Sequence, residues 1–521
     1  MWSADPRMVF GVVGLLIGGL VVMLMLADAF PLSGINLIFF SLLFLLLTLY
    51  RPNWVFLALV AVLPFETINL LPDAFGFALR PYQWLFVIVS LALAIRVLTR
   101  RTTGPLFRFG VLDAWLALVP IGAVISGVLF GGAGLHHAVV VVSFYALYLL
   151  GRIFFRTPGD VSVAAVALSA SGLVSLSFGI AQNIAFEQGR MLGAVMPGRP
   201  NGTFAEPDWL GLFAVIILFF LLSRLGELLR DEGGTITARL SRVGWFTVPL
   251  TIGLVTLILT VSRSAWLAAC LALVVWVSAT LIAGGKAVWR PVLQSIQVLV
   301  IIFVLALLVV VDIPLTRFDL LNRAGSTATG RQEITVACPV PTDLPSEIAS
   351  VDALSAFGCR HINLEEREVL AARGQSIQTT YRPDPNVVIR SSIYARSWEE
   401  IRQHPVFGIG WGNIGTVLGR DEHGTAYNAS NLWFEVWLGA GLTGLIGLIG
   451  AFGVIAWRGG CALLGPSERA ARSKAGSEGT LTALALSLLA IVFVFNLFNA
   501  GLLIGFVWIG FACFPALFPQ R

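Results

Sequence analysis

Long uninterrupted runs of hydrophobic residues recur along the whole chain, from Met8–Leu26 to Leu481–Leu497 and on to Phe514. Each run is about 20 residues long, which is the length that an α-helix needs to cross the hydrocarbon core of a bilayer. Backbone groups cannot stay unpaired in lipid, so such runs predict helices. They lack the alternation of polar and apolar residues that outer-membrane barrel strands require. We therefore predict an all-α, polytopic integral membrane protein.

The pattern predicts about fourteen transmembrane helices, with twelve to fourteen as the range. They are expected near residues 8–27, 34–50, 53–71, 81–98, 110–130, 137–154, 160–184, 207–224, 244–262, 264–284, 289–311, 430–456, 478–497 and 499–517. The first run follows Arg7 and lacks a small-residue cleavage site. We interpret it as a retained signal-anchor helix.

Composition and charge exclude a soluble globular protein and indicate the orientation in the membrane. Of 521 residues, 57% are hydrophobic and 12% are charged, whereas soluble domains average about 25% charged residues. Basic residues such as Arg100, Arg152, Arg239 and Arg458 occupy every second connection between the helices. By the positive-inside rule these connections are cytoplasmic. Both termini are then cytoplasmic, in the inner membrane of a bacterium, and the net charge of +5 reflects topology rather than a nucleic-acid partner.

One long polar segment divides the chain into three parts. Residues 1–311 carry predicted helices 1–11, residues 312–429 form a large extracytoplasmic loop, and residues 430–521 carry helices 12–14. Cys338 and Cys359 both belong to the loop, in a compartment that permits disulfides. Closing about 20 residues would stabilise the fold by about 3 kcal/mol in the chain-entropy model. Two free thiols are the alternative.

Polar residues gather in four clusters, all on the predicted outer face. In the first, Arg80 opens the fourth span and Glu66 lies near the end of the third, so Arg80 pairs either with a phosphate or with Glu66. The second is the turn-rich stretch Gly198–Asp208, in which Arg199 precedes a helix that we expect Asp208 to cap. A guanidinium beside a helix N-terminus suits an anion. An ordinary capped loop is the alternative reading.

The third cluster is a predicted tight hairpin, Ser262-Arg263-Ser264, between two strongly apolar spans. We expect its three side chains to offer hydrogen-bond donors at one depth for a diphosphate. The alternative is an arginine that snorkels to the interface beside Trp266. We favour the first interpretation, because an arginine between two serines here has little structural purpose.

The fourth cluster extends from Arg390 to Glu435. Ile393, Trp398 and Ile401 are spaced as on one face of a helix, which predicts an amphipathic helix on the membrane surface. The alternate glycines that follow, Gly408, Gly410 and Gly412, indicate a turn. No strand precedes them and no Gly-Lys-Ser/Thr follows, which argues against a nucleotide-binding loop.

The sequence has no group of histidine and cysteine residues at the spacing that a metal site requires. The five histidines include the adjacent His136 and His137, expected on a short outer loop, and none is paired with cysteine or histidine at ligand spacing. We therefore predict a metal-independent site with no cofactor, in which arginine neutralises any diphosphate.

Three segments together resemble the O-antigen ligase and polymerase family, which includes the lipopolysaccharide ligase, Wzy-type polymerases and exopolysaccharide polymerases. They are residues 199–208, residues 260–266, and residues 404–410 leading to 430–435 and 441–444. Each motif alone is weak, but their order and the large loop before the last motif agree with the family over roughly the second half of the chain. The first half is similar only as a row of helices.

The resemblance implies a C-type glycosyltransferase architecture. A polyprenyl-diphosphate-linked glycan enters from the outer leaflet, its sugar passes to an acceptor hydroxyl, and the diphosphate leaves. Carried over to this chain, Arg263 would hold the diphosphate, Arg199 and Arg390 would help, and Arg80 would complete a positive wall. Charge-assisted arginine–phosphate bonds suit a leaving group that gains negative charge.

The chain departs from the family in its last motif. Many members have a histidine before the asparagine, as the proposed base, whereas here Ser430 precedes Asn431. Serine is a poor proton acceptor near neutral pH. His423 or Glu435 could serve as the base, or the reaction depends mainly on stabilising the leaving group. The ligase branch relies on that histidine, so its absence favours a polymerase.

We therefore expect an enzyme that polymerises exopolysaccharide or O-antigen repeat units on the outer face of the inner membrane. An O-antigen ligase acting on lipid A-core is the first alternative. A polysaccharide or lipid transporter or flippase is the second, and a structural role the third; the mid-span segments are nearly free of charge, which disfavours transport. Expected partners are the lipid-linked oligosaccharide, a glycan or lipid acceptor, membrane lipids, and export or chain-length proteins.

Overall fold

The computed structural model describes residues 6–518, except 73–74, 102–105, 194, 196–197, 231–235, 363–365, 421–425 and 465–475. Each of the fourteen predicted ranges contains a helix. These helices are α1 (Pro6–Leu26), α2 (Gly34–Tyr50), α3 (Pro52–Val62), α4 (Pro81–Leu98), α5 (Val111–Phe130), α6 (Ala133–Phe154), α7 (Pro158–Glu187), α8 (Pro207–Arg230), α9 (Ile236–Leu259), α10 (Arg263–Gly284), α11 (Trp289–Val311), α16 (Leu432–Leu464), α17 (Gly476–Phe495) and α18 (Gly505–Leu517).

Eight helical stretches in the described part of the chain are long and apolar enough to cross a membrane. One of them, Arg263–Val311, contains α10, the short 3-10 turn η2 (Gly285–Val288) and α11. Five shorter apolar helices accompany them. The chain is therefore a mostly helical, multi-pass membrane protein, as its composition predicts. Its orientation in the membrane remains a prediction.

Two of the predicted spans are shorter than the sequence suggested. Helix α3 has 11 residues and ends at Val62, and α18 begins at Gly505. At 1.5 Å per residue α3 rises about 16 Å, roughly half the hydrocarbon core. The chain leaves helical geometry after α3 because the N–H groups of Glu66 and Thr67 donate to the carbonyl oxygen of Thr203, at 2.9 and 3.0 Å. Apolar residues such as Leu63 and Leu502 continue beyond these helix ends, although Pro64 after α3 is a sequence signal for a helix end.

Two smaller boundary predictions are also corrected. His136 and His137 lie inside α6 rather than on a loop, because the connection before it is made by Gly131 and Gly132 alone, both with positive φ. Cys461 lies within α16, which extends beyond its predicted end at residue 456.

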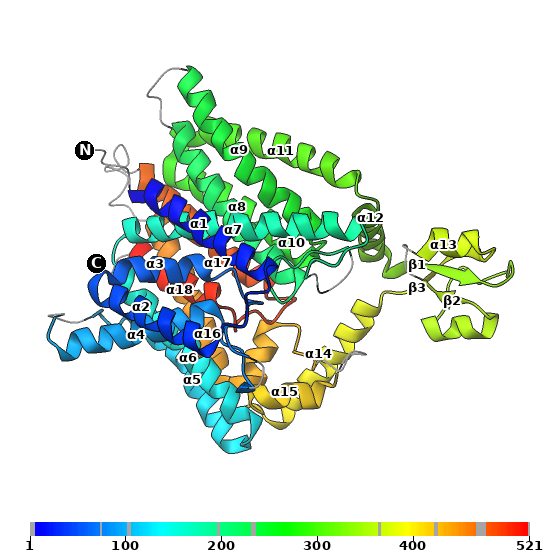
Figure 1. The fold of residues 1–521 in the computed structure, drawn as a ribbon, viewed down its shortest axis with the longest axis horizontal. Helices are drawn as coiled ribbons and strands as arrows, with labels where there is room; N and C mark the ends of the chain where they lie inside the picture. The colour runs from blue at the N-terminus through cyan, green and yellow to red at the C-terminus, as the bar shows by residue number, and fades with distance from the viewer. Residues whose placement is uncertain are drawn as a thin grey trace.

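The large loop contains a β-sheet, so the prediction of an all-α protein is wrong there. Strands β1 (Arg331–Cys338), β2 (Arg360–His361) and β3 (Ser376–Pro383) form an antiparallel sheet of order β2-β1-β3. It carries the 3-10 helix η3 (Val351–Phe357) and α13 (Arg367–Ala372). We call residues 331–383 the sheet module. Figure 1 shows it projecting from the helical body.

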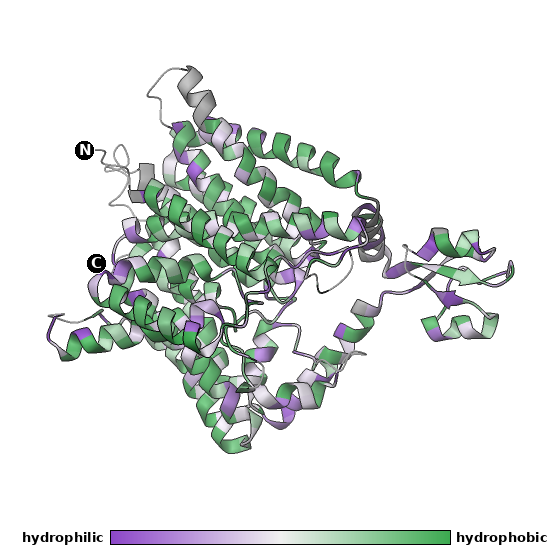
Figure 2. Ribbon diagram, in the orientation of Figure 1, coloured by the Kyte–Doolittle hydropathy of each residue, from purple (hydrophilic) through white to green (hydrophobic). Residues whose placement is uncertain are grey.

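A small core of its own holds the sheet module together. Cys338 and Cys359 form a disulfide across it, and both side chains are buried. Ile334, Val336 and Leu354 pack around the disulfide. Such a small domain buries too little apolar surface to be stable without a cross-link, which explains the disulfide. Figure 2 shows that hydrophilic residues concentrate in this module and in the connections, while the helical body is mostly apolar.

The remaining loop elements join the sheet module to the helical body. They are α12 (Pro314–Thr329), α14 (Pro385–Gln403) and α15 (Trp411–Leu418). On α14, Ile393 and Ile401 are each 2% exposed and belong to the main hydrophobic core. The Trp398 ring lies 6.1 Å from that of Trp437 on α16. Ile393 and Ile401 therefore pack against protein, whereas Trp398 is 41% exposed. That α14 lies on the membrane surface stays a prediction.

Candidate functional site

The four polar clusters meet at one end of the bundle, where α4, α8, α10, α16 and α18 all begin. The irregular segments before these helices contact one another through hydrogen bonds and ion pairs described below. We call this connected set the polar network. Helix N-termini carry partial positive charge and unpaired N–H groups. Five of them at one end favour anions there.

Arg80 and Glu66 form the first part of the network. The Nη1 atom of Arg80 lies 3.6 Å from Oε1 of the buried Glu66. The Glu66 backbone also bonds to Thr203, whose hydroxyl donates to the Pro64 carbonyl oxygen at 2.6 Å. Of the two partners considered for Arg80, the structure pairs it with Glu66. Its side chain remains 30% exposed.

Arg199 is the anchor of the second part and is 9% exposed. Its Nε donates to the carbonyl oxygen of Thr260 at 2.9 Å, and Nη2 lies 3.4 Å from Oδ1 of Asp208. Asp208 is inside the first turn of α8, which begins at Pro207, so it is not the cap that the sequence suggested. Arg199 therefore connects the 198–208 stretch to the start of α10.

Two side-chain amides on α7, which were not predicted as part of the site, hold the 198–208 stretch in place. Gln182 on α7 accepts from the N–H of Gly202 at 2.7 Å and donates to its carbonyl oxygen at 3.1 Å. Asn183 donates to the Gly198 carbonyl oxygen at 3.1 Å. Two adjacent amides within an otherwise apolar helix were the sequence feature that could have revealed this support.

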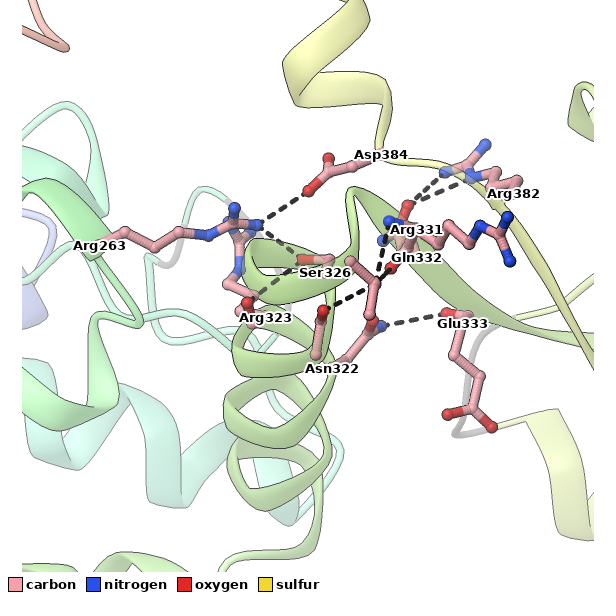
Figure 3. Close-up of polar contacts among 11 residues, drawn as sticks. Arg263, Asn322, Arg323, Ser326, Arg331, Gln332, Glu333, Arg382 and Asp384 are labelled. Carbon is pink, nitrogen blue, oxygen red and sulfur yellow. Dashed lines mark hydrogen bonds and ion pairs between the residues drawn. The ribbon is translucent and has the colours of Figure 1, made fainter.

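Arg263 is the first residue of α10, and its contacts are drawn in Figure 3. Its Nη2 lies 3.0 Å from Oδ2 of Asp384 and donates to Oγ of Ser326, also at 3.0 Å. Its Nε atom is buried and has no hydrogen-bond partner among the described residues. Arg263 therefore lies against the 312–429 loop, with one side of its guanidinium held by Asp384 and Ser326 and its side chain 31% exposed.

The serines beside Arg263 do not act as predicted. Ser262 and Ser264 are buried, and their hydroxyls lie 3.2 Å apart. The Oγ of Ser264 also accepts from Nδ2 of Asn499 at 2.9 Å. The expected row of three donors is thus not open on the surface. Both serine side chains are buried, Ser264 bonds to Asn499 in the segment before α18, and Ser262 bonds to Ser264.

In the last motif, residues 430–435, the contacts of Asn431 are with the backbone of the protein. Oδ1 of Asn431 accepts from the N–H groups of Trp433 at 2.9 Å and Phe434 at 3.2 Å, which makes Asn431 the N-cap of α16. Its Nδ2 donates to the Leu497 carbonyl oxygen at 2.9 Å. Ser430 has φ +49° and donates its N–H to Oδ1 of Asn428 at 2.8 Å. The motif therefore fixes the entry into α16.

Of the two candidate bases, Glu435 and His423, the structure describes only Glu435. Glu435 is buried in the first turn of α16, and its Oε2 accepts from the N–H of Ala429 at 2.7 Å. This contact closes the turn before the helix. His423 lies outside the described residues, in the short segment between α15 and α16.

Arg390 lies on α14, one turn before Tyr394. The hydroxyl of Tyr394 donates to the carbonyl oxygen of Ser430 at 3.1 Å. Burial raises the pKa of Tyr394, and the nearby Arg390 guanidinium partly opposes that rise. Arg390 forms no ion pair with any other residue for which the structure gives a position. It is thus a cation next to the last motif.

The network can hold an anion but offers little for a metal. Arginines at helix N-termini match the charge of a phosphate group. Among the described residues, no group of three or more His, Cys, Asp or Glu side chains is placed to hold a metal ion.

Residues 248–449 match the family model described as O-antigen ligase. The matched segment begins within α9 and ends within α16. It therefore contains Arg263, the whole sheet module and the 430–435 motif. A search of curated proteins finds no match to this chain.

Proposed function

We propose that this chain, a multi-pass membrane protein with an O-antigen ligase domain, polymerises exopolysaccharide or O-antigen repeat units on the outer face of the bacterial inner membrane. The domain match carries the assignment to membrane glycosyltransferases of the ligase and polymerase type. The donor in this proposal is a glycan linked to a polyprenyl diphosphate. The position of Arg263, at a helix N-terminus within the matched segment, supports that donor.

The proposed reaction is a single displacement in a C-type architecture. The acceptor hydroxyl oxygen attacks the anomeric carbon, the bond from that carbon to the diphosphate oxygen breaks, and the diphosphate leaves on its lipid. Arg263 donates to the leaving oxygens through the accessible part of its guanidinium, because its side chain is 31% exposed. Removing one such donor costs about 100- to 1,000-fold in rate in other enzymes.

In this proposal Arg199 positions α10, while Arg80 and Arg390 contribute only positive charge. Arg199 acts through the backbone, because its contact with the Thr260 carbonyl oxygen positions the start of α10. Arg80 and Arg390 are partly exposed and add positive charge around the donor. Their charge favours the diphosphate at longer range.

The proton of the acceptor hydroxyl must pass to a base. We propose His423 for this role, because Glu435 is held in the turn by Ala429 and Ser430 is a poor proton acceptor near neutral pH. The replacement of the ligase histidine by Ser430 is the reason to favour polymerisation over ligation to lipid A-core.

The proposal is tested by polymer length on a gel in a null strain complemented with each variant at matched membrane expression. Arg263→Ala should remove high-molecular-weight polymer, leaving single repeats on their acceptor, and His423→Ala should share the defect. Arg331→Ala is the matched control: Arg331 lies in the sheet module, is paired with Glu347 and lies outside the polar network. It should keep the wild-type ladder.

Other outcomes distinguish the alternatives. If Arg263→Ala leaves long polymer on its lipid carrier that fails to reach a final acceptor, the enzyme is a ligase. If lipid-linked repeats accumulate on the cytoplasmic side, the protein is a transporter. An unchanged ladder in Arg263→Ala would reject the diphosphate role of this residue.

A further inference from the structure

A cavity of about 440 Å³ lies at the opposite end of the bundle from the polar network. Its lining comes from the start of α3, the end of α6 and the start of α7, together with Phe10 of α1. Helices α3 and α7 both run from this cavity toward the polar network, which the segment after α3 and Gln182 of α7 help to form. The two sites are therefore separated by the length of the bundle.

The walls of the cavity are aromatic. The rings of Phe56 and Phe154 are stacked at 4.2 Å between centroids, and Phe10 meets Trp54 edge to face at 5.6 Å. Tyr50 is 74% exposed and Trp54 is 51% exposed. Tyrosine and tryptophan at helix ends are typical of the membrane interface, where one part of the ring contacts lipid and the other contacts water. The cavity thus opens at the level of lipid headgroups.

One cation lines the cavity. Arg51 connects α2 to α3, and its guanidinium carbon lies 5.0 Å from the centre of the Tyr50 ring. It forms no ion pair with any residue that the structure describes. The ring restricts the guanidinium without neutralising it, so Arg51 can bind a phosphate.

One anion lines the same cavity. Oδ2 of Asp160 accepts from the N–H groups of Arg156 and Thr157 and from the Thr157 hydroxyl, at 3.1, 2.8 and 2.9 Å. These contacts fix the carboxylate at the start of α7. Oδ1 of Asp160 has no hydrogen-bond donor within the described part of the chain, and the residue is exposed. A rigidly held carboxylate with one oxygen open is suited to bind a cation.

We propose that this cavity binds a phospholipid with a phosphoethanolamine headgroup. The phosphate pairs with Arg51, and the primary ammonium donates to Oδ1 of Asp160. The aromatic walls contact the glycerol and the first carbons of the acyl chains. A headgroup with only negative charge would leave Asp160 facing an anion, and a quaternary ammonium has no N–H to donate. The pair of charges therefore selects a zwitterion with a primary amine.

The proposal is tested by native mass spectrometry of the full-length protein released from nanodiscs. The nanodiscs contain equal parts of phosphatidylethanolamine, phosphatidylglycerol and phosphatidylcholine. Wild type should retain phosphatidylethanolamine preferentially. Arg51→Gln and Asp160→Asn should each reduce that retention about tenfold, the value expected for loss of one charge-assisted hydrogen bond. Asn keeps an oxygen to accept from the start of α7, so the helix cap is preserved.

Two controls keep the result interpretable. Arg101→Gln removes an exposed arginine outside the cavity lining and should change nothing. Arg51→Lys keeps the positive charge and should recover most of the retention. Equal retention of the three lipids by wild type, a preference for phosphatidylglycerol, or the same retention in Arg51→Gln as in wild type would each overturn the proposal. Polymer synthesis is not the readout, so the result is independent of the proposed function.

Discussion

At the scale of single residues, the pair of Arg263 and Asp384 is the contact with the largest consequence. Asp384 is 1% exposed and lies between β3 and α14, so its carboxylate ties the sheet module to the start of α10. The same contact holds one side of the Arg263 guanidinium, and Ser326 of α12 holds it as well. Asp384 is therefore a positioning residue for Arg263 in the proposed reaction.

Exchanging the two charges separates positioning from phosphate binding. Asp384→Ala should lower the free energy of unfolding by about 1 to 3 kcal/mol, because Arg263 loses the charged partner that is buried against it. The double variant Arg263→Asp with Asp384→Arg restores opposite charges and should recover part of the melting temperature, since the larger arginine must fit where Asp384 is 1% exposed. It should make no long polymer, because no arginine then stands at the start of α10. Thermal unfolding in detergent and the polymer gel measure the two effects.

The conservative variant Asp384→Glu provides the control for this exchange. It keeps the charge and should retain part of both stability and polymer length. If the charge-exchanged protein were stable and also polymerised normally, the position of Arg263 would not matter and the assignment would be wrong.

At the scale of elements, a kink in α16 holds the segment that precedes α15. The helix is interrupted at Gly441, which has φ +66°. The kink frees the carbonyl oxygen of Leu438, which accepts from the N–H groups of Ile409 at 2.7 Å and Gly410 at 3.1 Å. The N–H of Leu442 donates to the Val406 carbonyl oxygen at 2.9 Å. Two motifs noted separately in the sequence are thus hydrogen-bonded to each other.

Gly441→Ala should destabilise the protein by about 2 kcal/mol or more. The positive φ alone costs about 1 to 2 kcal/mol for a residue with a Cβ, and the new Cβ would overlap the Val406 carbonyl oxygen. A lower melting temperature and faster proteolysis of the 404–418 region would report the change.

Gly453→Ala is the matched control on the same helix. Gly453 has helical geometry, and a Cβ there would meet no atom within 4 Å. It should be neutral or slightly stabilising, because alanine favours helix more than glycine by about 1 kcal/mol. Equal melting temperatures for the two variants would mean that the kink contributes nothing.

At the scale of the whole molecule, the sheet module projects from the apolar helical body on the side of the polar network (Figure 1). Its disulfide belongs in an oxidising compartment. The positive-inside prediction places it on the outer face independently. Both arguments favour the prediction that the sheet module lies outside the cytoplasm.

The orientation can be measured with a maleimide that does not cross membranes. In intact spheroplasts Ala371→Cys should be labelled, because Ala371 is exposed on α13 of the sheet module. The natural Cys461 is exposed at the end of α16 away from the polar network, and it should react only after permeabilisation. Labelling of Cys461 alone in intact spheroplasts would reverse the predicted topology.

The sequence by itself determined where the apolar helices lie, apart from some of their ends, and which stretches are polar. Both properties are local: a run of about 20 apolar residues must be helical in lipid, whatever its neighbours. The motifs around Arg199, Arg263 and Asn431 were visible for the same reason, since they interrupt apolar runs. Cys338 and Cys359 were also placed together as a disulfide candidate from their shared loop and compartment.

Only the tertiary structure decided how these pieces meet. Asp384 lies 121 residues from Arg263 in the chain, and Asn499 lies 235 residues from Ser264, so no local pattern connects them. The early end of α3 was not predicted from hydrophobicity because Leu63, Phe65 and Ile68 continue the apolar run, although Pro64 is a local signal for a helix end. There the backbone bonds to Thr203 instead of continuing the helix. Hydrogen bonds between distant segments decide such boundaries, and hydrophobicity along the chain does not record them.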